Sequence, residues 1–174
     1  MNKNNLLLII AVSIIVLLAR LLPHAPNFSP LASVILFTGV YAANKKYLII
    51  PLVASFISDL MIGFYHLPVM LSIYGSFVLI GLLGILVKKH KNIINTISAT
   101  IGAGLLFFLL TNFAVWYSST WYSHDLAGLS LCYNLAIPFF KSTLTSNLVY
   151  SGLLFGVYEG AMYLVRQKKT VFNK

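Results

Sequence analysis

Long apolar stretches separated by short polar breaks dominate the pattern of this sequence. The breaks are lysine clusters, proline-rich turns and one long polar segment. A helix crosses a hydrocarbon core of about 30 Å with about 20 apolar residues. The pattern therefore predicts an all-α membrane protein, a single domain over residues 1–174 with six transmembrane helices. The predicted spans are residues 6–22, 31–43, 47–65, 69–87, 93–118 and 143–165.

The segments between the spans carry their own predictions. Pro23, Pro26 and Pro30 exclude a helix through 23–30, because proline lacks an amide donor and clashes with the preceding turn. The stretch 31–43 is short for a span and is expected to be tilted, extended by loop residues or partly re-entrant inside protein. The sequence further predicts that residues 119–134 form the longest loop and that 135–141 form an interfacial helix.

Composition excludes most soluble classes of protein. Hydrophobic residues make up 59% of the chain and charged residues only 9%, against about 25% charged residues in soluble domains. The single cysteine, Cys132, excludes an intramolecular disulfide and cannot form a zinc site alone. A cytosolic enzyme and a disulfide-stapled secreted domain are therefore both excluded.

The net charge of +9 becomes informative once the basic residues are placed along the chain. With six alternating spans and an inner amino terminus, only Arg20 and Lys141 fall outside. This strong positive-inside bias predicts that both termini are cytoplasmic. It also makes nucleic acid an unnecessary explanation of the charge. The ten inner residues are Lys3, Lys45, Lys46, Lys88, Lys89, Lys91, Arg166, Lys168, Lys169 and Lys174.

Polar and aromatic residues gather toward the predicted outer side, where they would suit a ligand pocket. Ionisable groups at membrane depth are costly and are candidates for function. Three alternatives remain open: Arg20 and Asp59 only pair with each other, the aromatic residues form an interfacial belt, or the asparagines join helices. The candidate ligand-binding residues are Arg20, Asn27, Asp59, Asn112, Trp116, Tyr122 and Asn147.

No motif for metal binding or catalysis appears. His24, His66 and His124 show no metal-ligand spacing together with Cys132. Ser123-His-Asp125 is consecutive, so these side chains do not converge as a catalytic triad does. We therefore expect no catalytic residues, no metal, no cofactor and no enzymatic activity.

Glycines in the last span form the clearest packing signal. Gly152, Gly156 and Gly160 lie on one helix stripe, and such small residues let membrane helices approach closely. The stripe either packs within the monomer or faces a partner subunit. Gly39-xxx-Ala43 is a weaker pair of the same kind.

Several segments resemble a known family. They are RLLPHAPNFSP (20–30), FTGVY (37–41), SDLMIG (58–63), TNFAVW (111–116), GLSLCY (128–133) and AIPFF (136–140). Together they resemble bacterial membrane proteins regarded as transport proteins related to the substrate-binding S components of energy-coupling factor (ECF) vitamin transporters. The resemblance covers residues 20–165.

The resemblance implies a fold and a function. S components have six helices with both termini inside, and they bind a vitamin near the outer face without hydrolysing anything. They pair with a transmembrane T subunit and two ATPases, and many dock through an Ala-xxx-Ala pair. Here the residue four positions after Ala11 is Ile15, so the first span lacks such a pair at this place. A solitary or oligomeric protein is therefore the alternative to the partnership with a T subunit.

Two functions follow as expectations. The first is uptake of a vitamin or related small molecule through an outward-facing pocket. The second is a structural scaffold subunit that uses Gly152, Gly156 and Gly160 as its interface.

Overall fold

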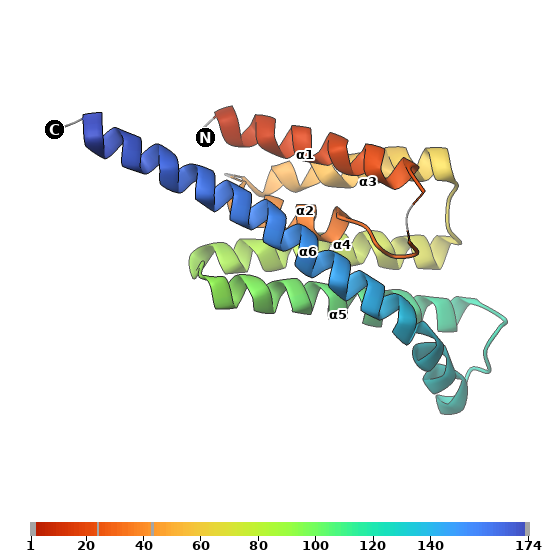
Figure 1. Cartoon of the computed structure of the whole chain (residues 1–174). Helices are drawn as coiled ribbons and strands as arrows, with labels where there is room; N and C mark the ends of the chain where they lie inside the picture. The colour runs from red at the N-terminus through yellow and green to blue at the C-terminus, as the bar shows by residue number, and fades with distance from the viewer. Residues whose placement is uncertain (1–2, 24, 43, 173–174) are drawn as a thin grey trace.

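All regular secondary structure is helical in the residues that a computed structural model describes, 3–23, 25–42 and 44–172 (Figure 1). The predicted all-α class is confirmed in this part of the chain. His24 and Ala43 lie outside the described residues. The elements are α1 (Lys3–Leu21), α2 (Leu31–Tyr41), the 3-10 helix η1 (Lys45–Leu48), α3 (Ile49–Ile62), α4 (Leu67–Lys89), α5 (Ile93–Ser118) and α6 (Leu126–Phe172).

Within the described residues, three stretches are long and apolar enough to cross a membrane: α4, α5 and Leu126–Gln167 of α6. The helices Leu6–Leu21 and Leu31–Tyr41 are apolar but shorter. Consecutive helices run in opposite directions, so α1 begins and α6 ends at the same end of the bundle (Figure 1). We call this the basic end, because η1 and the α4–α5 turn place lysines there. The opposite end, where α1 finishes, is the Arg20 end.

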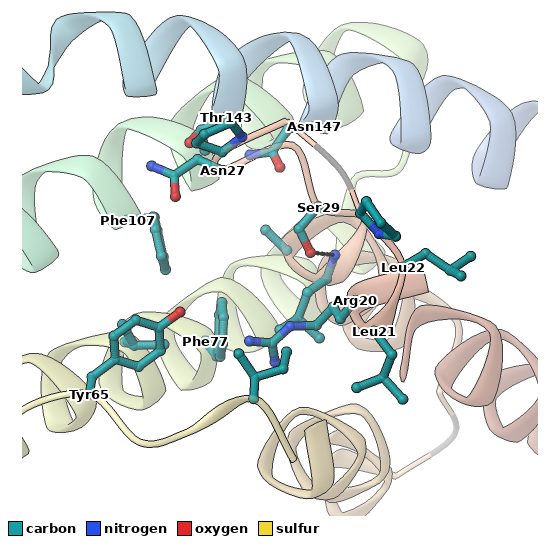
Figure 2. Close-up of a pocket in the computed structure, with 16 residues that line it drawn as sticks. Arg20, Leu21, Leu22, Asn27, Ser29, Tyr65, Phe77, Phe107, Thr143 and Asn147 are labelled. Atoms are coloured by element: carbon teal, nitrogen blue, oxygen red, sulfur yellow. Dashed lines mark hydrogen bonds between the residues drawn. The ribbon is translucent and has the colours of Figure 1, made fainter. Parts of the chain in front are cut away.

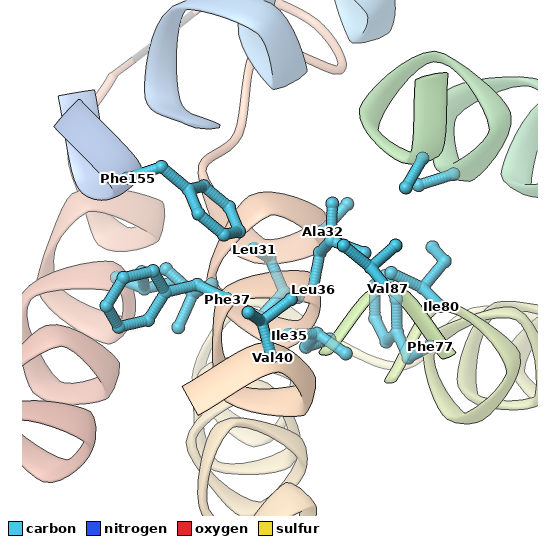
Figure 3. Close-up of a cluster of buried hydrophobic side chains, with 14 residues drawn as sticks. Leu31, Ala32, Ile35, Leu36, Phe37, Val40, Phe77, Ile80, Val87 and Phe155 are labelled. Atoms are coloured by element: carbon cyan, nitrogen blue, oxygen red, sulfur yellow. The ribbon is translucent and has the colours of Figure 1, made fainter. Parts of the chain in front are cut away.

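Helix α2 lies at the centre of the bundle. Every residue from Leu31 to Val40 is buried, and α2 contacts all five other α-helices. Its Leu36 and Phe37 belong to a cluster that includes Ile80 of α4 and Phe155 of α6 (Figure 3). A helix of 11 residues is only about 16 Å long. The stretch 31–43 therefore contains a short helix surrounded by protein, and its tilting, its extension by loop residues and a partly re-entrant path stay predictions.

Glycines bring the backbones of α2 and α4 together. A Cβ on Gly39 would lie 2.3 Å from the carbonyl oxygen of Gly81 and 2.9 Å from the Cα of Gly84. A Cβ on Gly84 would lie 2.5 Å from the carbonyl oxygen of Leu36. No side chain fits at either position, so the close approach of these two helices requires glycine there.

The predicted loop 119–134 and interfacial helix 135–141 are wrong, since α6 is continuous from Leu126. The Asp125 carboxylate starts the helix by accepting the backbone N–H of Gly128 at 2.7 Å, which is an N-cap. This bond is the main reason that the pKa of Asp125 lies below its ordinary value. Pro138 lies inside α6, and the helix changes direction in this region (Figure 1), as expected where an amide is missing.

The glycine contact yields a stability prediction. We expect Gly39→Ala to force α2 and α4 apart and to destabilise the protein by about 1–3 kcal/mol, as overpacking does. The matched control is Gly75→Ala in α4, where a Cβ would have no neighbour within 4 Å. Thermal unfolding in detergent measures both variants. Equal melting temperatures for the two variants would contradict the proposed role of the glycine contact.

Candidate functional site

A cavity of about 570 Å³ lies at the Arg20 end, and residues from all six α-helices line it (Figure 2). Phe77 and Phe107 stack at a centroid distance of 5.6 Å and form part of its mostly apolar wall. Apolar walls with sparse polar groups are typical of small-molecule sites. The polar residues that line the cavity are Arg20, Asn27, Ser29, Tyr65, Thr143 and Asn147.

Arg20 is held in a network of hydrogen bonds on one side of the cavity. Its Nη2 pairs with Asp59 Oδ1 at 2.7 Å, and its Nη1 donates to Ser55 Oγ at 2.8 Å and to Ser58 Oγ at 2.6 Å. The Tyr74 hydroxyl donates to the other Asp59 oxygen at 2.6 Å. The Arg20–Asp59 pair left open by the sequence is therefore present, and Arg20 also borders the cavity.

The local sequence of α3 explains this network. Ser55, Ser58 and Asp59 are spaced so that they share one face of α3, and all three are buried. A buried carboxylate requires a cation and further donors, which Arg20 and Tyr74 supply. The four-residue spacing of Ser55 and Asp59 indicates from the sequence that they share a helix face. Nothing in the sequence indicates that Tyr74 donates a hydrogen bond to Asp59.

Asn147 is the predicted residue with the most informative surroundings. Its side chain is only 2% exposed, it borders the cavity (Figure 2), and its Nδ2 has no hydrogen-bond partner. Buried polar groups are almost always hydrogen-bonded, so this amide is an exception. Asn27 borders the cavity from the loop 22–30, with a positive φ of 59° that asparagine tolerates.

Residues 25–30, which border the cavity, are held in place by α6. Ser142 Oγ donates to the carbonyl of Pro26, and Ser146 Oγ donates to the carbonyl of Ser29, each at 2.7 Å. The two serines are four residues apart, so a single face of α6 holds the loop. The position of α6 thus determines where the loop closes on the cavity.

The remaining predicted ligand residues lie elsewhere. Asn112 donates its amide to a backbone carbonyl of its own helix at 2.8 Å. Trp116 Nε1 donates to the Ser123 carbonyl at 2.9 Å, which ties the loop 119–125 to α5. Burial raises the pKa of Tyr122 in that loop. None of these three residues borders the cavity, and Asp59 lies behind Arg20 rather than on the wall.

The glycine stripe is not packed within the described chain. A Cβ on Gly152, Gly156 or Gly160 would meet no atom within 4 Å. The packing inside the monomer that the spacing suggested is therefore absent, while a partner remains possible. Gly152 and Gly156 border a second cavity, of about 670 Å³.

Metal ligands are not clustered in the described part of the chain. No group of three or more His, Cys, Asp and Glu side chains in that part could hold a metal ion. His124 packs edge-on against Trp116, and Cys132 is buried as a free thiol.

Comparison with known proteins gives a family and no function. A family model described as "Family of unknown function (DUF6580)" matches residues 1–170. No curated protein and no solved structure matches the chain.

The Arg20–Asp59 pair yields a second stability prediction. We expect Arg20→Met and Asp59→Leu each to destabilise the protein by about 3–5 kcal/mol, because each leaves a buried charge unpaired. The double variant is expected to lose much less than the sum. Lys141→Met, at an exposed position, is the control and should change stability by less than about 0.5 kcal/mol. Additive losses in chemical unfolding would mean that the pair is not coupled.

Proposed function

The chain belongs to this family of unknown function, and we propose that it is a non-catalytic membrane protein that binds a small, vitamin-like molecule for uptake. The proposal rests on the cavity at the Arg20 end and above all on one observation. That observation is the buried Asn147 amide, which borders the cavity and has no partner for its Nδ2.

The proposed setting is a bacterial cytoplasmic membrane with six spanning helices and the basic end in the cytoplasm. The alternating direction of the helices (Figure 1) and the lysines of η1 and the α4–α5 turn support this orientation. Helices α2 and α3 have only 11 and 14 residues, so they reach across the bilayer only together with their loops. Protein surrounds α2 on all sides. Loop backbone that continues α2 at membrane depth is acceptable only when it is buried in protein in this way.

The unpartnered amide suggests what the ligand must offer. Leaving a buried amide without a hydrogen bond costs about 1–3 kcal/mol. A ligand acceptor, such as a carbonyl oxygen or ring nitrogen, placed beside Asn147 Nδ2 would recover that cost. The cavity volume of about 570 Å³ lies within the usual range for small-molecule sites.

The charge balance favours an uncharged ligand. The Arg20 guanidinium is already neutralised by Asp59 at 2.7 Å and donates to two serine hydroxyls. An anionic ligand would have to compete with that carboxylate. A flat, neutral molecule with one or two acceptors fits better, with its ring against the wall that contains Phe77 and Phe107. Aromatic side chains suit such a face.

This proposal corresponds to an S-component-like protein. A T subunit with ATPases is one proposed partnership, and a solitary or oligomeric protein is the other.

A scaffold subunit is the second candidate function. The observation that favours it is the unpacked stripe of Gly152, Gly156 and Gly160, because small residues in membrane helices commonly mark a helix interface. Recovery of a stable protein partner with no small molecule bound would support the scaffold over the binding protein.

Native mass spectrometry of the purified protein, followed by thermal shift against neutral vitamins and nucleobases, tests the proposal. We expect a co-purified small molecule and a saturable rise in melting temperature, since a ligand of the folded state stabilises it. Detection of lipid alone, with no response across the panel, would refute ligand binding.

Paired asparagine variants test the place of binding. We expect Asn147→Leu to weaken affinity about tenfold, which corresponds to a loss of about 1.4 kcal/mol. Asn112→Leu should leave affinity within about twofold, because Asn112 bonds only to its own helix and does not border the cavity. Equal effects of the two variants would place the ligand elsewhere.

A further inference from the structure

The second cavity, at the basic end, has no part in the proposed binding of a ligand. It has a volume of about 670 Å³ and lies between α5 and α6. At one edge, Glu159 accepts hydrogen bonds from Lys91 and from Tyr41. Farther inside the bundle it is bordered by Thr100 and Ser151. It therefore extends from the basic end toward the first cavity.

One face of α6 connects the two cavities. Thr143, Asn147 and Ser151 follow at intervals of four residues, so they lie one above another on the helix. Thr143 and Asn147 border the first cavity, whereas Ser151 borders the second. A single helical turn, about 5.4 Å, separates Asn147 in the first cavity from Ser151 in the second.

The two residues at this junction both carry an unpartnered polar atom. Asn147 Nδ2 and Ser151 Oγ have no hydrogen-bond partner, although the residues are only 2% and 5% exposed. One such atom fits a binding site. Two in succession, between two cavities, fit a route along which a polar molecule exchanges hydrogen bonds as it moves.

Helix α5 provides little obstruction opposite this junction. Gly104 faces Asn147, since a Cβ on Gly104 would lie 3.2 Å from Nδ2. Thr100, one turn earlier, borders the second cavity, and its hydroxyl is satisfied by a carbonyl of its own helix. A glycine and an internally bonded threonine thus oppose the two unpartnered groups. On the second cavity's side, a Cβ on Gly152 or Gly156 would meet no atom within 4 Å, so these two positions of α6 do not narrow the cavity.

We propose that this chain contains its own translocation path, which runs from the first cavity past Asn147 and Ser151 into the second cavity. Gly104 and Thr100 form the opposite wall of the constriction. The inference rests on the proposed function and adds that a small neutral solute crosses within one chain, down its gradient.

Cysteine accessibility tests the path without a known ligand. Cys132→Ala removes the native thiol, and Thr143→Cys, Thr96→Cys and Ser151→Cys are then added singly. Thr96 borders the second cavity, and Leu153→Cys, at a position 57% exposed on α6, is the lipid-facing control. The probe is a charged, membrane-impermeant methanethiosulfonate, applied to intact cells and to inverted vesicles.

The path predicts a distinct labelling pattern. Thr143→Cys should react in cells, Thr96→Cys in inverted vesicles, and Ser151→Cys in both preparations at rates within about tenfold of each other. Leu153→Cys should react at least tenfold more slowly than Ser151→Cys in both. Adding Gly104→Ala, which narrows the constriction, should slow labelling of Ser151→Cys at least tenfold in cells and leave it unchanged in vesicles.

Different failures refute different claims. Labelling of Ser151→Cys from one side only, or from neither, refutes the path and leaves the ligand cavity standing. Labelling of Leu153→Cys as fast as Ser151→Cys also refutes the path. Absence of labelling at Thr143→Cys in cells refutes an outward-facing cavity, and with it the proposed function.

Discussion

The close contact between the backbones of α2 and α4 is the constraint on which the rest of the fold depends. Gly39 and Gly84 allow it, because any side chain at either position would overlap a carbonyl oxygen of the facing helix. Because α2 packs closely against α4, this short helix lies at the centre of the bundle, where the other five α-helices contact it. Its first residues, Leu31 and Ala32, then form part of the cavity wall. The position of the candidate site thus follows from a packing contact at the other end of α2.

The buried ion pair sets the chemistry of that site. Asp59 is only 1% exposed, and such a carboxylate persists only with a cation and further donors around it. In this network Asp59 pairs with Arg20 and accepts a hydrogen bond from Tyr74. Arg20 also donates to the hydroxyls of Ser55 and Ser58. Arg20 therefore contributes a polar surface with little net charge.

The sequence predicted the all-helical class of the described chain correctly and predicted the contacts of single polar residues poorly. The stretch 93–118 coincides with α5, since its hydrophobicity and flanking polar residues mark both ends. The predicted loop 119–134 is wrong over its second half, because α6 starts at Leu126. The signal for that start is Asp125, since a carboxylate before an apolar periodic run is a typical N-cap.

Two asparagines show why local pattern has a limit. Asn112 and Asn147 both occur within apolar helices, so sequence cannot distinguish them. Asn112 reaches a carbonyl of its own helix, whereas Asn147 faces Gly104 and finds no acceptor. The difference lies in the neighbouring helix, which no single-chain pattern records. The glycine stripe on α6 is a similar case, because its spacing indicates close packing, whereas a Cβ on any of its three glycines would meet no atom of the described chain within 4 Å.

The unpartnered groups also bear on the choice between a binding protein and a scaffold. A partner helix seated on Gly152, Gly156 and Gly160 would satisfy the stripe, but it would not reach Asn147, which is 2% exposed. Under the scaffold hypothesis the buried, unpaired amide would destabilise the protein by about 1–3 kcal/mol and would serve no function. A leucine of similar size would remove that cost. Under the binding hypothesis the same amide is the group that a ligand acceptor satisfies, so the energetic defect of the free protein becomes a source of affinity.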